Sequence, residues 1–197
     1  MRVIEIVPGQ VITRESRAWL PVKEGYVQAD VDRGILHIAV VDRHRGTKNV
    51  GKAFIRGLGL KRGAIASTVA HDHHNTVVGG TSPNDMLTAI KHLKKIHGGF
   101  AAVSSGKVIA DLPLELAGLM ATKPAEHVVS KLTKLNKTVQ TKLGATLKAP
   151  FMQLQFITLP TVPELGITDK GLVDSMKYEI IDPIIEVKVD EIIKFPT

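Results

Sequence analysis

The stretch that decides the fold reads SPNDMLTAIKHLKKIHGGFAAVSSGKVIADL, residues 82–112. Ser82 can cap a helix, Pro83 suits its first position, and Asp85 stands at capping-box spacing. Apolar residues then recur every three or four positions until Gly98 ends the pattern. Two apolar runs follow on either side of residues 104–106, which is typical of a β-hairpin. The stretch therefore predicts a helix followed by two antiparallel strands.

The segments around this stretch extend the same pattern. Residues 35–41 alternate along a strong strand, and shorter strand signals follow at residues 49–60, 65–70 and 76–78. Downstream, a second helix is expected at about residues 124–143, ended by Gly144, while residues 151–159 fit either strand or helix. Helices interleaved with hairpins predict an α+β fold, with helices flanking a mixed, largely antiparallel sheet. The expected division is a peripheral N-terminal segment at 1–25, a main domain at 26–183, and a C-terminal strand and tail at 184–197.

Composition narrows the class of protein. The chain has 197 residues, of which 44% are hydrophobic, so it can build a core. It has no cysteine, which excludes disulfides and thiolate metal sites and favours a cytoplasmic location. It has no apolar run long enough for a transmembrane helix, so we expect no membrane association. The net charge is +7, and part of it falls in one run without an acid: Arg43, Arg45, Lys48, Lys52, Arg56, Lys61 and Arg62.

That basic run fits a solvated surface better than a nucleic-acid site. Aromatic residues make up only 4% of the chain, so the stacking surfaces used by single-strand binders are scarce. We expect nucleic-acid binding to be weak, non-specific and steeply reduced by salt.

The densest polar cluster is HDHHN at residues 71–75, between two strand signals. Three imidazoles, a carboxylate and a carboxamide can donate, accept and titrate near neutral pH. In an extended segment His71 and His73 would point to one face, and Asp72 and His74 to the other. An H-x-H pair could be half of a metal site, which needs a third protein ligand. The candidates for that ligand are His37, His44 and Asp85.

The stretch IASTVAHDHHN, residues 65–75, resembles the C-terminal domain of adenine deaminase, a family of the amidohydrolase superfamily that has IASTVAHDSHN here. The resemblance runs from about residue 3 to residue 178. The chain departs from it at His73, where the family has serine, at Asp42, where it has glutamate, and at Phe100 after Gly98 and Gly99. Further matching motifs occur in the family's order: VDRH-x-GT at 41–47, ND-x at 84–86, GKV at 106–108, LPL at 112–114, AGLM at 117–120, PFM at 150–152, LP at 159–160, PEL at 163–165 and TDKGLVD at 168–174.

The resemblance implies that the catalytic metal centre lies in a part of the enzyme other than this domain. The family hydrolyses adenine to hypoxanthine and ammonia with a manganese or iron centre held by a (β/α)8 barrel. A barrel takes about 250 residues, and this chain has too few for one. The pair His71 and His73 would then lie in the wrong domain to be the superfamily's metal-binding H-x-H. No metal or other cofactor is expected in this chain, and the chain alone is expected to be inactive.

The expected role is therefore accessory to a barrel domain or chain, with adenine as a possible ligand and a homo-oligomer possible. One alternative is a free-standing module that binds a purine without catalysis. Others are an independent metal hydrolase built on His73, and an RNA-binding protein. If the chain is accessory to a barrel, the residues expected to line the site are His71, Asp72, His74 and Asn75.

Overall fold

The structure is a computed structural model that describes residues 1–185. The strand predicted at residues 184–189 extends outside the described residues, as does most of the predicted tail. No helix in the described part is long and apolar enough to cross a membrane.

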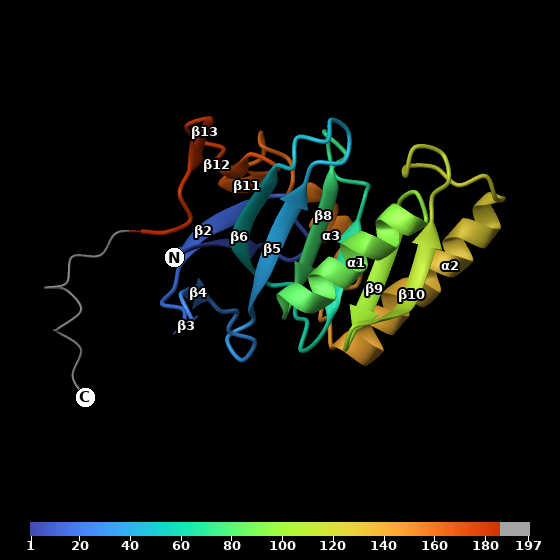
Figure 1. The fold of residues 1–197 in the computed structure, drawn as a ribbon, viewed down its shortest axis with the longest axis horizontal. Helices are drawn as coiled ribbons and strands as arrows, with labels where there is room; N and C mark the ends of the chain where they lie inside the picture. Colours follow the sequence, from blue (N-terminus) through green and yellow to red (C-terminus); the bar gives the residue numbers. More distant parts are fainter. Residues whose placement is uncertain (186–197) are drawn as a thin grey trace, which may run out of the picture.

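Within residues 1–185 the main sheet has eight strands, in the order β10–β9–β7–β8–β5–β6–β1–β2 (Figure 1). All neighbours are antiparallel except β1 and β6, which run parallel. This confirms the predicted α+β fold with a mixed, largely antiparallel sheet. The strands are β1 Arg2–Ile6, β2 Thr13–Arg17, β5 Ile35–Val41, β6 Val50–Arg56, β7 Ala64–Ser67, β8 Thr76–Gly80, β9 Gly99–Ser104 and β10 Lys107–Pro113.

The N-terminal residues belong to this sheet. Strand β1 lies between β6 and β2, and Val3 and Ile4 on it are fully buried. The expectation that residues 1–25 are peripheral therefore does not hold for β1, whose partner on β6 is about fifty residues away in the chain, as in the pair Val3 and Phe54. A short hairpin follows, made of β3 Val22–Lys23 and β4 Tyr26–Val27. The expected domain boundaries stay a prediction.

Helix α1, Pro83–Lys95, covers β7, β8 and β9 on one face of the sheet (Figure 1). Ser82 caps it as predicted, since its Oγ accepts the Asp85 N–H at 3.3 Å. The carboxylate of Asp85 instead accepts the backbone N–H of Gly106 at 2.7 Å. Asp85 thus joins the start of α1 to the turn of the β9–β10 hairpin, which fixes helix and hairpin as one unit.

The opposite face carries α2 Ala125–Thr138, its π-helical continuation Val139–Leu143, and α3 Pro150–Phe156. Gly144 ends α2 in the left-handed conformation, with φ of 83°, as predicted. The ambiguous run after Pro150 is helical over α3. Phe151 of α3 is 1% exposed, and its ring lies 5.3 Å from that of Phe100 on β9. Aromatic packing therefore anchors α3 to the sheet.

A second sheet of β11 Leu165–Thr168, β12 Gly171–Asp174 and β13 Glu179–Ile181 packs against β6. Its closest approach is at Gly51 of β6, where a Cβ atom would collide with the carbonyl oxygen of Thr168. Only glycine leaves room for this contact. The contact sets the position of the β11–β12 turn, which carries Asp169.

Candidate functional site

The loop of residues 68–75 joins β7 to β8 at the end of the sheet toward which the β5 arrow points in Figure 1. Residues 71–73 form a turn, and His74 has a φ of 49°. The segment is therefore not extended, and the two faces described for that case do not apply. The ring of His71 lies 5.2 Å from Phe156 and 5.5 Å from His74, so its neighbours in the site are set by the turn and by α3.

Arg43, directly after β5, holds this loop in place. Its Nε donates to the carbonyl of His74 at 2.6 Å, and its backbone N–H donates to Oδ1 of Asn75 at 3.2 Å. A second guanidinium nitrogen donates to the carbonyl of Ala117 at 2.8 Å. Hydrogen bonds from a charged donor are among the stronger ones. Arg43 therefore joins the end of β5, the loop of residues 68–75 and the loop of residues 114–120.

Asn75 is the most buried residue of the cluster, at 5% exposed. Its Nδ2 donates to one oxygen of Asp169 at 3.2 Å, and Nδ2 of Asn49 donates to the other at 3.3 Å. Asp169 lies in the β11–β12 turn, and its carboxylate holds both amides in place. The one sequence signal that bears on it is its place in the motif TDKGLVD.

The predicted site residues do come together in this loop, with different degrees of exposure. Two of them are tied to the fold: the carbonyl of His71 accepts from Thr158 Oγ1 at 2.9 Å, and Nδ1 of His74 accepts the Ala70 N–H at 3.2 Å. Asp72 is exposed and makes no hydrogen bond to an imidazole in the described part of the chain. Asp72 therefore orients no histidine of the loop, and its exposed carboxylate is available to a partner.

Burial favours the neutral form of two histidines of the loop, His73 and His74. Burial lowers the pKa of His73, against the opposing charge of Asp169, and it also lowers the pKa of His74, where His71 and Arg43 add to the effect. In both rings Nδ1 accepts a backbone N–H, for His73 that of Asn75 at 3.0 Å, so the neutral rings carry their proton on Nε2. The Nε2 of His73 is buried and has no hydrogen-bond partner among residues 1–185.

The lowered pKa of His73 makes stability depend on pH. Its unfolded form takes up a proton near pH 6.5, whereas the folded form resists protonation. The free energy of unfolding should therefore fall as pH is lowered from about 7.5 to about 5.5. Urea unfolding at both pH values measures this. His73→Asn, which keeps an acceptor near the position of Nδ1, should reduce the pH dependence, and His127→Gln on the exposed side of α2 should not. An unchanged pH dependence in His73→Asn would contradict this assignment.

The donor atoms of the cluster do not fit a metal centre. No group of three His, Cys, Asp or Glu side chains among residues 1–185 is arranged to hold a metal ion. Both Nδ1 atoms of His73 and His74 and both oxygens of Asp169 are engaged in internal hydrogen bonds. The suggested third ligands lie elsewhere or are engaged: His37 packs on Phe54, Asp85 binds Gly106, and His44 Nε2 lies 3.0 Å from two loop carbonyls. That this chain carries no cofactor stays a prediction.

A groove of about 560 Å³ lies beside the loop. It runs between the β1–β2 turn, residues 146–149 and α3, and Phe156 forms one wall. Because Phe156 also contacts His71, the groove and the polar loop are continuous. The groove's other apolar lining residues are Pro8, Val11, Leu147, Ala149 and Met152, and its polar ones are Gln10, Thr146, Lys148 and Gln153.

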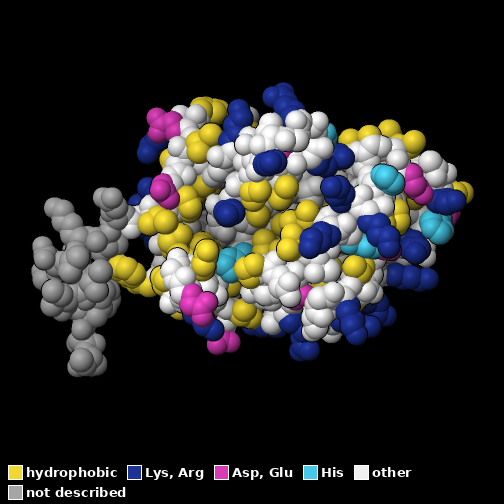
Figure 2. Space-filling view, viewed as in Figure 1, with side chains coloured by type: hydrophobic (Ala, Val, Ile, Leu, Met, Phe, Trp, Pro, Cys, Tyr) yellow, Lys and Arg dark blue, Asp and Glu magenta, His cyan; other side chains and the backbone are white. Residues whose placement is uncertain are grey.

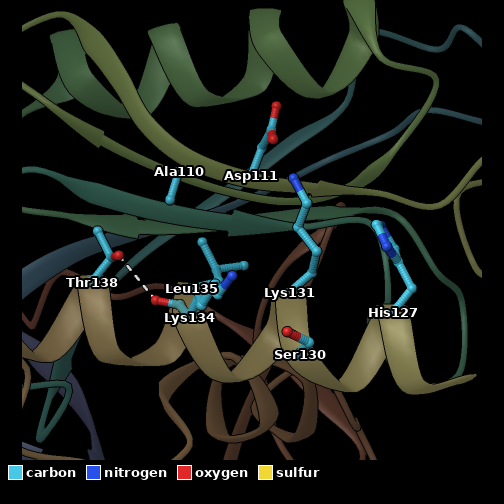
Figure 3. A pocket seen from close by; sticks show the side chains of 8 residues that line it. All are labelled: Ala110, Asp111, His127, Ser130, Lys131, Lys134, Leu135 and Thr138. Carbon is cyan, nitrogen blue, oxygen red and sulfur yellow. Dashed lines mark hydrogen bonds between the residues drawn. The ribbon is translucent and has the colours of Figure 1, made fainter.

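A second hollow, of about 340 Å³, lies between β10 and α2, away from the predicted site residues (Figure 3). His127, Lys131 and Lys134 line its helical side, and Asp111 of β10 lies at its edge with its carboxylate directed away from α2. That carboxylate already pairs with His92, whose Nε2 lies 2.7 Å away. Figure 2 shows Lys and Arg side chains gathered over this end of the molecule, where α1, β10 and α2 meet. The hollow is an open cationic surface, and the expectation of weak nucleic-acid binding stays a prediction.

The fold and the loop define an α+β domain that presents a rigid polar segment. The family described as "Adenine deaminase C-terminal domain" matches residues 10–179. The adenine deaminase of Dehalococcoides mccartyi is 46% identical over 181 residues, which are 92% of this chain and 32% of that protein. That of Desulforamulus reducens is 47% identical over 186 residues (94% and 32%), and that of Brucella abortus 47% over 180 residues (91% and 31%). The chain belongs to the adenine deaminase C-terminal domain family, and it spans about a third of the length of these relatives.

Proposed function

We propose that this chain serves as the accessory domain of an adenine deaminase, a cytoplasmic hydrolase of the amidohydrolase superfamily that converts adenine to hypoxanthine and ammonia. The observation that carries the proposal is the match to the C-terminal domain family, over nearly the whole chain, in enzymes about three times as long. The metal would be held by the remaining two thirds of such an enzyme, because no group of three His, Cys, Asp or Glu side chains among residues 1–185 is arranged to hold a metal ion.

The loop of residues 71–75 is the part of this domain proposed to face the catalytic site. His71 and Asp72 can reach a partner, because they lie on the turn, where His71 is partly exposed and Asp72 is exposed. Behind them Asn75, Arg43 and Asp169 fix the backbone of the loop. A site positioned in this way loses little of its geometry to side-chain motion. His71, Asp72 and His74 would line the site, with Asn75 as a positioning residue.

The proposal is tested in a chimera in which this chain replaces the matching third of the Dehalococcoides mccartyi enzyme. His71→Ala and Asp72→Ala should each lower adenine deamination by roughly 10- to 100-fold, the usual cost of losing a group that supports a metal site. The melting temperature of the chimera should barely change, because both residues lie on an exposed turn. Ammonia release and thermal unfolding are the two measurements.

Matched controls exist in the chain. Asp32→Ala removes an exposed aspartate outside the loop, and His127→Ala removes an exposed histidine of α2. Both should leave activity unchanged. If His71→Ala and Asp72→Ala lower only the melting temperature and leave the folded fraction fully active, the loop is structural and its assignment to the site is wrong.

A further inference from the structure

Exposed apolar side chains border the loop of residues 71–75 on one side. They belong to the loop of residues 114–120, where Leu116 is 48% exposed and Met120 is 60% exposed. This loop is fixed to the polar cluster by two hydrogen bonds, from Arg43 to the carbonyl of Ala117 and from Thr68 Oγ1 to the carbonyl of Gly118 at 2.6 Å. The apolar residues are therefore held beside the cluster.

A second apolar area borders the cluster at the groove beside α3. Met152 there is 58% exposed and Val11 is 44% exposed, and the groove meets the cluster where Phe156 contacts His71. The polar loop thus lies between two apolar areas. Large exposed apolar areas on a soluble domain mark surfaces that another protein covers.

We infer that this surface, which we call the docking face, is where the remaining two thirds of a full-length adenine deaminase packs against this domain. The docking face comprises residues 68–75, residues 114–120 and the groove beside α3. The inference rests on the proposed function. It adds the surface of this domain that is covered, and the apolar contacts that hold the polar loop against the rest of the enzyme.

The relative lengths and the charge favour this occupant over a second copy of the chain. Relatives carry about twice as much further polypeptide as this domain contains, enough to cover a stable interface of roughly 1,200–2,000 Å². Two copies of a chain with a net charge of +7 repel each other, and Arg43 lies within the face. The exposed pair Met176 and Tyr178 lies at the opposite end of β12 from Asp169, outside the docking face.

Hydrogen exchange locates the covered surface directly. Amide exchange is compared between this chain alone and the chimera with the Dehalococcoides mccartyi enzyme. Residues 114–120 and 146–156 should exchange roughly ten-fold more slowly in the chimera, and residues 175–178 at an unchanged rate. Slower exchange confined to α2, to the β3–β4 hairpin or to the β12–β13 turn would overturn the docking face. The proposed function would still stand in that case if the chimera deaminates adenine.

Three methionine substitutions test the same face with matched chemistry. Met120→Asp and Met152→Asp each place a charge in the face, and Met176→Asp places one on an equally exposed methionine outside it. The first two should remove the added protection and lower ammonia release by the chimera at least ~10-fold, while the chain alone unfolds as before. Equal effects of all three, or of none, would overturn the docking face. A chimera that is inactive, while the parent enzyme is active, would instead contradict the proposed function.

Discussion

Given adenine and manganese, the purified chain is expected to release no ammonia above background. Hydrolytic deamination needs an activated water and groups free to move its protons. In this chain His73, His74 and Asp169 are committed to internal hydrogen bonds. The chimera with the Dehalococcoides mccartyi enzyme should in contrast turn over in the ordinary enzyme range, ~1 to 10³ per second. Ammonia release from the two proteins under identical conditions is the measurement.

Turnover by the chain alone within that range would contradict the accessory role. His73→Ser supplies the control, because serine is what the resemblance places there. If the chain alone is active and His73→Ser abolishes the activity, an independent hydrolase built on His73 becomes the correct reading. If the activity survives in that variant, it belongs to a contaminating enzyme or to other residues.

Phe151→Ala is expected to lower the free energy of unfolding by about 3–5 kcal/mol, the usual cost of removing a buried aromatic ring from a core. Phe151 is 1% exposed and packs edge-on against Phe100, so its loss leaves a cavity between α3 and the sheet. Urea unfolding of the isolated chain measures the change. Since α3 also carries Phe156, the ring contact with His71 should loosen as well.

The neighbouring Met152→Ala is the control for this prediction. Met152 lies on the same helix and is 58% exposed, so its truncation in the isolated chain should change the free energy of unfolding by less than about 0.5 kcal/mol. Comparable losses in both variants would contradict the assignment of this stabilisation to the burial of the Phe151 ring.

The fold was predictable where the signals are local. Ser82, Pro83 and Gly98 predict both ends of α1 because capping and turn preferences act within a few residues. The parallel pairing of β1 with β6 was not predictable, because the two strands lie about fifty residues apart in the chain. No local sequence signal indicates which distant strand β1 pairs with. Residues 151–159 stayed ambiguous until the contact between Phe151 and Phe100 selected a helix. Tertiary packing decides such short apolar runs.

The candidate site shows the same limit. Composition alone picks out residues 71–75, but the faces of His71 and His73 were predicted from an extended backbone, and the loop is a turn. The residues that hold the loop, Arg43 and Asp169, come from 31 and 94 positions away. Spacing along the chain carries no information about contacts of that range.

The contact between Asn75 and Asp169 also has a consequence for synthesis on the ribosome. The eight strands of the main sheet are complete once residue 113 has emerged, but the acceptor for Asn75 follows 94 residues after it. At ~5 to 20 residues per second, translation supplies Asp169 roughly 3 to 11 s after residue 113. During this interval all eight strands have been synthesised while the histidine loop still lacks the carboxylate of Asp169, so a chain that ends before Asp169 cannot complete the site.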